Sequence, residues 1–223
     1  MPDLPEHHEV VHHSPVGIAE TSTVMAAAGP LAGRWVLVVG AGTGFYPRLF
    51  RAAGASRVVG VDADRSLIAY AQRQEERDPL GISCEVHSPL KLPVIGDFDV
   101  VVAFGVAGPL DVVVAGLAAN VRPGGLLVFA HLTPAALAGA VPGFAVTPDF
   151  EEAEGTRVTV RVEADPPVSF ESFVRAPGTV EAALAAAGLR SIEQQPVTVP
   201  TDDESWRPLV ANPPFAVLTA RQP

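Results

Sequence analysis

The stretch Val36–Gly44, which reads VLVVGAGTG, is an apolar strand that runs into a turn of three glycines. A continuous apolar run of this kind is typical of a parallel strand that is buried on both faces of a sheet. Glycines directly after such a strand let the backbone approach a ligand where a Cβ atom would collide. Gly40, Gly42 and Gly44 meet that requirement, and we therefore expect a ligand pocket at this end of the sheet.

The second signal is an acidic residue at the end of the next predicted strand, VVGVD at 58–62. In a doubly wound α/β sheet, a carboxylate about 20 residues after the glycine turn hydrogen-bonds the hydroxyls of a ribose, and Asp62 stands at that position. A dinucleotide fingerprint would require a glycine where this chain has Phe45. The G-x-G-x-G turn instead admits a nucleoside ligand that carries no phosphate.

The run from Val36 to Asp62 resembles motif I and the following acidic position of class I S-adenosylmethionine-dependent methyltransferases. DFDVVVA at 97–103 and VRPGGLLVF at 121–129 fall where that family keeps its fourth strand and the turn into its fifth. The resemblance covers about residues 31–132. It implies an α/β, Rossmann-like fold with a seven-stranded, mostly parallel sheet, helices on both faces, and S-adenosylmethionine as the cofactor.

Three further segments resemble a subgroup of that family that contains toxoflavin synthase. They are RDPLGI at 77–82, Trp206, and NPPFAVL at 212–218. That subgroup methylates small nitrogen heterocycles in bacterial secondary metabolism. The resemblance therefore implies natural product or antibiotic biosynthesis, with methyl transfer to a nitrogen or oxygen of a small metabolite and a heteroaromatic acceptor favoured.

Composition narrows the class of partner and the compartment. The formal net charge of −10 and the single lysine, Lys91, argue against nucleic acid as the substrate. No apolar run approaches about 18 residues and the N-terminus lacks the form of a signal peptide, so we expect a cytoplasmic protein without a membrane partner. Cys84 is the single cysteine, which excludes an internal disulfide and predicts a buried packing role. A small-molecule substrate is expected, and a homodimer stays open.

With 223 residues, 48% of them hydrophobic, the chain predicts one methyltransferase domain over residues 1–223. We divide it into an N-terminal lid segment (1–30), a cofactor-binding half (31–132), a substrate-side insertion (133–176) and a C-terminal helix with strands (177–223). Strict alternation of apolar and polar residues in RVTVRVE at 157–163 predicts a half-buried strand. A second strand is predicted at Ser169–Arg175, and we therefore expect an antiparallel insertion. The other predicted strands are 35–39, 58–61, 82–86, 98–103, 126–130, 189–198 and 215–220, and the helices are 46–53, 65–76 (N-capped by Asp64), 109–120 and 179–187.

Ligands of open α/β sheets lie across the carboxyl ends of the strands, and the resemblance implies how each candidate there binds the cofactor. The glycine turn approaches its methionine and ribose parts, Asp62 holds the ribose hydroxyls and Ala63 lies near the adenine. Ser88 stands where the family has an acidic residue that accepts from the adenine amino group, and Phe104 packs on the adenine or in the core. Val38 and Ala41 replace a common Asp and Cys of motif I. The expected cofactor residues are Gly40, Ala41, Gly42, Gly44, Asp62, Ala63, Ser88 and Phe104.

Two residues are candidates for chemistry. His131 follows the fifth strand and is the best general base by location, because an imidazole titrates near neutrality; a structural histidine is the alternative. Tyr46 in the glycine turn could orient the methionine moiety or the substrate, or simply pack at a helix start. Trp206 is expected in the core.

Charged and histidine-rich stretches offer further alternatives. His7, His8, His12 and His13 invite a metal interpretation, but a flexible polar tail is favoured and no metal is expected. The acidic run Asp149, Glu151, Glu152 and Glu154 predicts a solvated loop; over the pocket, it would favour a cationic or amine-bearing substrate. Two rival functions remain open: a cyclase or lyase that binds S-adenosylmethionine without methyl transfer, and a non-catalytic S-adenosylmethionine-binding protein.

Overall fold

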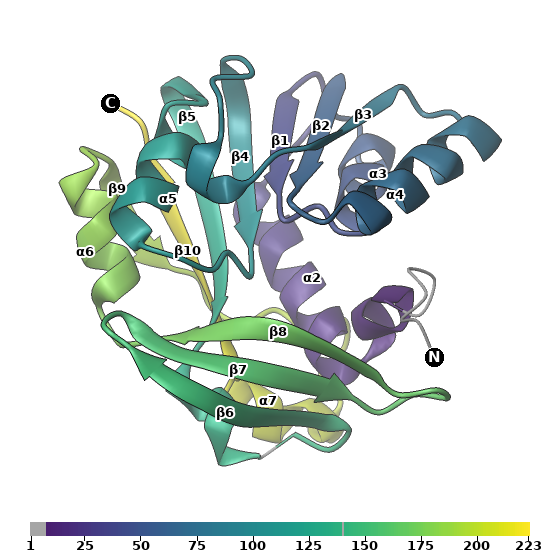
Figure 1. The fold of residues 1–223 in the computed structure, drawn as a ribbon, viewed down its shortest axis with the longest axis vertical. Helices are drawn as coiled ribbons and strands as arrows, with labels where there is room; N and C mark the ends of the chain where they lie inside the picture. The colour runs from purple at the N-terminus through teal and green to yellow at the C-terminus, as the bar shows by residue number, and fades with distance from the viewer. Residues whose placement is uncertain (1–7, 140) are drawn as a thin grey trace.

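The structure is a computed structural model that describes residues 8–139 and 141–223. Within these residues, seven strands lie side by side in the order β3-β2-β1-β4-β5-β10-β9 (Figure 1). β1 to β5 pair in parallel, and β10 is antiparallel to both of its neighbours. The predicted mostly parallel, seven-stranded sheet is therefore confirmed. The bounds are β1 (Trp35–Val39), β2 (Arg57–Asp62), β3 (Ile82–Val86), β4 (Phe98–Phe104), β5 (Val121–Leu132), β9 (Arg190–Gln194) and β10 (Phe215–Arg221).

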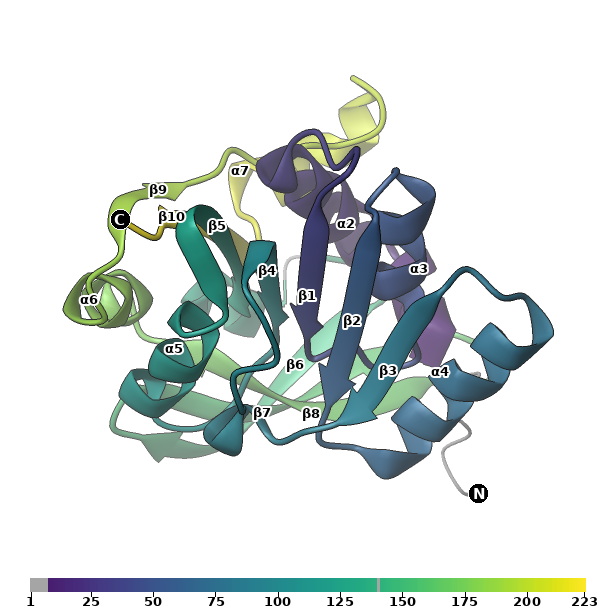
Figure 2. The same ribbon diagram turned by 90° about the horizontal axis from the view of Figure 1, so that it is seen from above.

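Helices cover both faces of the sheet, as the views in Figures 1 and 2 show. Alternate residues of β1 enter different cores: Val36 and Val38 pack with one set of helices, whereas Leu37 and Val39 pack with the other. This division follows from the pleat, which points successive side chains to opposite faces. The first set is α2 (Pro15–Ala28), α3 (Phe45–Ala52) and α4 (Arg65–Arg77), and the second is α5 (Leu110–Ala118) and α6 (Thr179–Ala186).

The insertion is a three-stranded antiparallel sheet of β6 (Phe144–Glu152), β7 (Gly155–Val162) and β8 (Val168–Arg175). It joins the main sheet where Leu132 of β5 pairs in parallel with Val174 of β8. Figure 1 shows these strands crossing below the carboxyl ends of β1 and β4. The insertion therefore closes one side of the edge at which we expected the ligand.

One prediction in the insertion was wrong. The acidic run that begins at Asp149 is not a solvated loop, because it forms the end of β6 and the turn into β7. Pro148 and the acidic residues hide the alternation that would reveal a strand, and pairing with β7 overrides this weak local signal. Similarly, the strand predicted at 189–198 ends at Gln194, since Pro196 cannot continue a ladder.

The N-terminal lid segment contains a short helix, Glu9–His13, followed by α2. Ser14 caps α2 by accepting a hydrogen bond from the backbone N–H of Gly17 at 3.1 Å. The helix α2 packs against β5 and β10. His7, one of the histidines considered as metal ligands, lies outside the described residues.

Local details agree with other expectations. Asp64 caps α4 through the N–H groups of Ser66 and Leu67 and also accepts from the Ser66 hydroxyl. The hydroxyl, followed by these N–H groups, lowers the pKa of the Asp64 carboxyl. Cys84 is buried, and burial raises the pKa of its thiol to about 11. Trp206, in a short helix (Glu204–Trp206) before α7 (Arg207–Ala211), packs against the core that contains α2. In the described part of the chain, no helix has the length and apolar character needed to cross a membrane.

Candidate active site

The glycine turn is tied to the end of β2 by the backbone and by one side chain. The backbone N–H of Gly40 donates to the carbonyl of Val61 at 2.9 Å. The N–H of Gly42 donates to Oδ2 of Asp62 at 2.9 Å, while Oδ1 accepts from the N–H of Asp64 at the same distance. Asp62 is thus fixed by two backbone donors at the edge where the strands end.

The glycines of this turn serve different purposes. At Gly40, a Cβ atom would lie 2.4 Å from the carbonyl oxygen of Phe104, so this glycine lets β1 approach the end of β4. At Gly42, φ is +54° and nothing lies within 4 Å of the Cβ position, so the backbone faces open space. Gly44 precedes α3 and faces Ala71 rather than a cavity. Gly42 is therefore the position where a ligand can approach the turn.

A cavity of about 520 Å³ opens beside this turn at the carboxyl ends of β2, β3 and β4. Of the residues that we expected at the adenosine end, Asp62, Ala63, Ser88 and Phe104 all line it, together with Gly40. The hydroxyl oxygen of Ser88 also accepts a hydrogen bond from the N–H of Leu90 at 3.3 Å. The sequence thus brings five predicted residues to one cavity.

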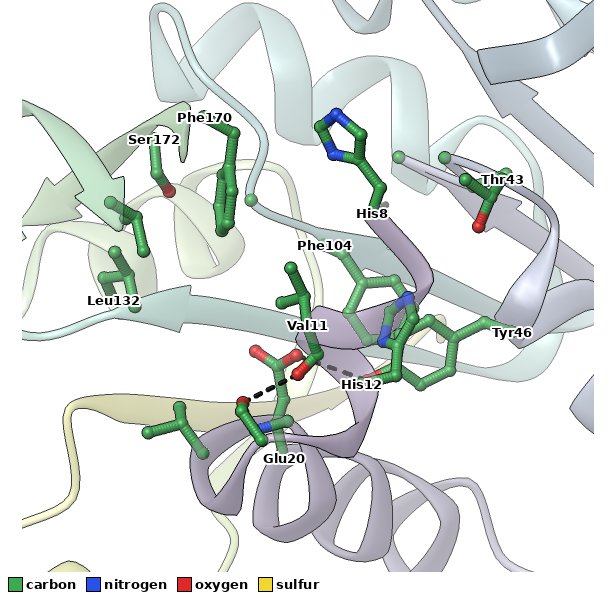
Figure 3. A pocket seen from close by; sticks show the side chains of 18 of the residues that line it. His8, Val11, His12, Glu20, Thr43, Tyr46, Phe104, Leu132, Phe170 and Ser172 are labelled. Carbon is green, nitrogen blue, oxygen red and sulfur yellow. Dashed lines mark hydrogen bonds between the residues drawn. The ribbon is translucent and has the colours of Figure 1, made fainter. Parts of the chain in front are cut away.

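A second, smaller cavity of about 230 Å³ adjoins the first, because Gly40 and Phe104 line both. Figure 3 shows side chains that line this smaller cavity. Its walls come from the N-terminal segment, the glycine turn, the end of β5 and the insertion, and they are mainly apolar. Ala41 and Gly42, which we expected at the cofactor, line this cavity, as do both candidates for chemistry. Its other lining residues include His8, Val11, His12, Glu20, Thr43, Leu132, Phe144, Phe170 and Ser172.

Tyr46 stacks on Phe104, with ring centroids 3.8 Å apart and an interplanar angle of 18°. Its hydroxyl lies 3.1 Å from Oγ1 of Thr21 and donates to Oε2 of Glu20 at 3.2 Å. Burial, followed by the charge of Glu20, raises the pKa of the Tyr46 hydroxyl well above its usual value. Tyr46 therefore stays protonated and acts as a hydrogen-bond donor at neutral pH.

His131 lies near the end of β5 and contacts the same cavity. Nδ1 is 3.0 Å from the carbonyl oxygen of Leu132, a geometry in which Nδ1–H donates and Nε2 carries the lone pair. Burial lowers the pKa of His131 below its usual value. A neutral imidazole at this position is able to accept a proton.

Glu20 is a site residue that the sequence did not single out. It projects from the apolar helix α2 into the smaller cavity (Figure 3), and burial raises its pKa to about 7. A lone acidic residue in the helical sequence PVGIAETSTVMAAA is the signal that could have identified it.

His12 was considered only as a metal ligand. It stacks on Phe45 with ring centroids 4.0 Å apart and meets the ring of Tyr46 edge-on. Burial, with smaller contributions from His13 and His8, lowers its pKa to about 4. The structure shows no group of three or more His, Cys, Asp or Glu residues with metal-binding geometry in the described ranges.

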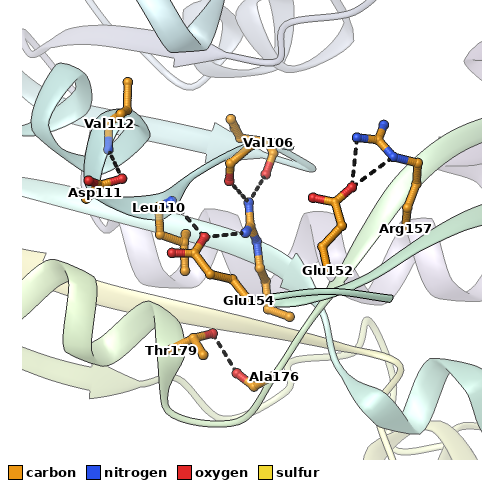
Figure 4. Close-up of polar contacts among 11 residues, drawn as sticks. Val106, Leu110, Asp111, Val112, Glu152, Glu154, Arg157, Ala176 and Thr179 are labelled. Carbon is orange, nitrogen blue, oxygen red and sulfur yellow. Dashed lines mark hydrogen bonds and ion pairs between the residues drawn. The ribbon is translucent and has the colours of Figure 1, made fainter. Parts of the chain in front are cut away.

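Arg175 of β8 connects the insertion to the loop that follows β4. Figure 4 shows the polar contacts of this region, with Val106, Leu110 and Glu154 labelled. It is 1% exposed, and Nη2 donates to the carbonyl oxygens of Val106 at 2.6 Å and Gly108 at 3.1 Å. Nη1 lies 3.4 Å from Oε2 of Glu154, which also accepts from the N–H of Leu110 at the start of α5. Because Val106 lines the larger cavity, this buried arginine fixes part of its wall.

The idea that the acidic run overhangs the pocket finds no support in these contacts. Glu154 pairs with Arg175, and Glu152 pairs with Arg157 on the outer side of the hairpin. Glu151 accepts from the hydroxyl of Thr156. Neither cavity is lined by any of the four acidic residues, Asp149, Glu151, Glu152 and Glu154.

Comparison with known proteins agrees with the fold and the glycine turn. Residues 36–125 match the family model described as "Methyltransferase domain". A ribosomal protein L11 methyltransferase of Burkholderia ambifaria is 37% identical over 93 residues, which are 42% of this chain and 30% of that relative. The chain therefore spans about a third of the length of this relative.

Solved structures resemble nearly the whole chain. A S-adenosylmethionine-dependent methyltransferase from Mesorhizobium loti has a TM-score of 0.67 and 24% identity, with 94% of this chain and 100% of that chain covered. An amino pentose methyltransferase from Micromonospora echinaspora, solved with S-adenosylmethionine bound, has a TM-score of 0.57 and 21% identity, with 97% and 96% covered. At this identity the likeness concerns the fold.

Fold and sequence together indicate the class: residues 36–125 match a methyltransferase domain, and the fold of the chain resembles that of S-adenosylmethionine-dependent methyltransferases. The residues present fit that cofactor. The Asp62 carboxylate offers acceptors for ribose hydroxyls, and the open face of Gly42 leaves room for a ligand against the turn. The cofactor of this class is S-adenosylmethionine.

Proposed function

We propose that this protein transfers a methyl group from S-adenosylmethionine to a nitrogen or oxygen of a small metabolite. The observation that carries the proposal is the smaller cavity, which adjoins the cofactor edge and is walled by the N-terminal helix and the insertion. Its volume of about 230 Å³ suits a small acceptor. A cavity walled on several sides also excludes water, which strengthens electrostatic interactions inside it.

The proposal gives each group of residues a role. When bound, S-adenosylmethionine supplies a methyl group on a sulfonium sulfur, so that the acceptor lone pair forms the new bond while the S–C bond breaks and leaves its electron pair on sulfur. Asp62 and the glycine turn hold the nucleoside. Phe104 lines both cavities, and Tyr46 stacks on it from the smaller one. His131 is available to accept a proton from the acceptor. Positioning of this kind supplies about 7–11 kcal/mol of the barrier reduction.

The finer parts of the proposal concern the acceptor and its pathway. The aromatic side chains of Tyr46, Phe104, Phe144 and Phe170 line the smaller cavity and favour a planar, heteroaromatic acceptor. The resemblance to the toxoflavin synthase subgroup supports the same chemistry. The amino pentose methyltransferase among the structural neighbours is described as involved in calicheamicin biosynthesis, which supports a place in secondary metabolism. We further propose that residues 1–223 act as one domain, with the cofactor half at 31–132.

Product analysis tests the proposal. The purified protein is incubated with S-adenosylmethionine and a panel of small heteroaromatic amines and hydroxyl compounds, and the cofactor product is identified by mass spectrometry. S-adenosylhomocysteine together with a methylated acceptor supports the proposal. Methylthioadenosine identifies the cyclase or lyase alternative, and tight cofactor binding without any product favours a binding protein. Methylation of RNA or protein with no small-molecule product would contradict the proposed substrate class.

A further inference from the structure

Glu20 lies where a charged acceptor would meet the protein. Its carboxyl group projects from α2 into the smaller cavity. The helix α2 packs against β5 and β10, whereas the larger cavity lies at the ends of β2 and β3. Tyr46 donates to Oε2, and this is the one hydrogen bond that the Glu20 side chain makes among the described residues. The carboxyl group therefore keeps accepting positions that are open to a ligand.

The charges around Glu20 leave it uncompensated. Among the described residues that line this cavity, Glu20 is the single carboxylate, and no lysine or arginine is present. The other titratable groups there are His8, His12, Tyr46 and His131. Lowered pKa values keep His12 and His131 neutral near pH 7, and a raised pKa keeps the Tyr46 hydroxyl protonated. An ionised Glu20 therefore meets no lysine, arginine, His12 or His131 cation in the described lining of this cavity.

The hydrogen-bond chain also has a direction. Because the Tyr46 hydroxyl donates to Glu20, the hydroxyl of Thr21 donates to the oxygen of Tyr46. The Tyr46 hydroxyl thus orients its proton toward the carboxyl group, which favours the ionised form of Glu20 and fixes its position. Rings of Tyr46, Phe104 and Phe170 line the same cavity, and aromatic faces attract cations. Carboxylate and rings together select a positively charged group over a neutral or anionic one.

We propose that the methyl acceptor is a small ring-bearing amine, that Glu20 binds it as an ammonium ion, and that Glu20 then takes one proton from its nitrogen. The proton moves from nitrogen to a carboxylate oxygen of Glu20, which frees the lone pair that the methyl transfer needs. After transfer, the methylated nitrogen is again cationic, and Glu20 returns its proton to solvent when product leaves. This inference rests on the proposed function and narrows its substrate class to amines.

The raised pKa of Glu20 also makes proton transfer from an amine more favourable. Burial brings the pKa of Glu20 to about 7, closer to that of an amine than an exposed carboxyl would be. Proton transfer in such a pair costs less free energy than transfer to an ordinary glutamate. His131 remains available as a second acceptor on the other wall of the cavity.

Calorimetric titration of the S-adenosylhomocysteine complex tests the inference with defined probes. Benzylamine joins one ring to a primary amine, and benzyl alcohol and benzoate are its neutral and anionic counterparts. At pH 8 the wild type is expected to bind benzylamine at least tenfold more tightly than benzyl alcohol, with benzoate the weakest. The variant Glu20→Gln should lose this preference. The control Glu9→Gln, which removes a carboxylate that lines neither cavity, should keep it.

The outcomes separate the inference from the function on which it rests. Failure of the wild type to bind S-adenosylhomocysteine would overturn the proposed function itself. Binding of S-adenosylhomocysteine without a preference for benzylamine overturns only the inference, as does a preference that survives in Glu20→Gln. If Glu20→Gln instead weakens S-adenosylhomocysteine binding tenfold and leaves the amine preference intact, Glu20 pairs with the ammonium of the cofactor and the inference fails. Infrared spectroscopy of the folded variants verifies that a protonated carboxyl band near neutrality is lost in Glu20→Gln.

Discussion

The backbone N–H of Gly42 donates a hydrogen bond of 2.9 Å to Oδ2 of Asp62, 20 residues further along the chain. The two signals that identified the pocket in the sequence are therefore in direct contact. This hydrogen bond orients the glycine turn and also fixes the carboxylate at the cofactor edge. Loss of either partner should affect both the shape of the turn and the binding of the nucleoside.

Replacement of Asp62 by alanine should weaken S-adenosylhomocysteine binding by at least tenfold, because a charge-assisted hydrogen bond is worth about 1.5–3 kcal/mol. Asp62→Asn keeps an oxygen that accepts from Gly42 and should lose less affinity. The control is Asp203→Ala, which removes the N-cap of the short helix Glu204–Trp206 at a small cost in stability. Asp203 lines neither cavity, so this variant should leave binding nearly unchanged. Titration calorimetry measures all three. Equal affinity of Asp62→Ala and wild type would exclude Asp62 from the cofactor site.

Alanine at Gly40 should mainly lower stability, whereas alanine at Gly42 should mainly weaken cofactor binding. Gly40→Ala places a Cβ atom 2.4 Å from the Phe104 carbonyl oxygen at a φ of +79°, so it should lower the free energy of unfolding by at least about 2 kcal/mol. Gly42→Ala meets no protein atom, so its folding cost is about 1 kcal/mol, but its methyl group enters the space beside the turn. It should bind S-adenosylhomocysteine at least tenfold more weakly. Chemical denaturation and calorimetry distinguish the two, and similar losses of stability would contradict the distinction.

Much of the fold was predictable because local and tertiary signals agree. The apolar run of β1, the cap at Asp64 and the glycine turn each have a short-range physical cause that is visible in the sequence. The antiparallel strands β7 and β8 showed the alternation of a half-buried sheet. These elements were placed within one or two residues of their bounds.

What the sequence could not indicate depends on contacts between distant segments. β6 was missed because its pairing with β7 outweighs a proline and several acidic residues. Glu20 and Tyr46 are 26 residues apart, and their hydrogen bond exists only once α2 lies against the sheet. Arg175 resembled any basic residue at the end of a strand until the loop after β4 closed around it. Site residues of this kind need the fold before their chemistry can be inferred.

Substitution of Arg175 by methionine should destabilise the protein by about 3–5 kcal/mol, because it leaves a carboxylate and two carbonyls without their donor. The matched control is Arg157→Met, which removes the ion pairs with Glu152 and Glu171 at the surface of the insertion and should cost about 1 kcal/mol or less. Urea denaturation measures both. A comparable small effect at the two positions would show that Arg175 does not fix the loop after β4.

Substitution of Glu20 by glutamine should stabilise the protein, and increasingly so as pH rises. The pKa of Glu20 is about 7 in the folded state and 4.5 as its ordinary value, so the unfolded chain releases this proton first. The contribution of Glu20 to stability is therefore greatest below pH 4.5, falls as pH rises from 4.5 to 7, and is constant above pH 7. Glutamine mimics the protonated form and avoids the loss. The difference in unfolding free energy should grow from near zero at pH 4.5 to at most about 3 kcal/mol above pH 7.

The opposite behaviour of His12 makes a paired measurement necessary for this prediction. The pKa of His12 is lowered to about 4, so its contribution to stability is lost as pH falls from 6.5 toward 4, which partly masks the effect of Glu20 in the wild type. Subtraction of the Glu20→Gln curve from that of the wild type removes the shared contribution of His12. Denaturation at several pH values between 4.5 and 8 provides both curves. A difference that is independent of pH would show that Glu20 ionises normally, and the carboxyl group would then be hydrated rather than held in a dry cavity.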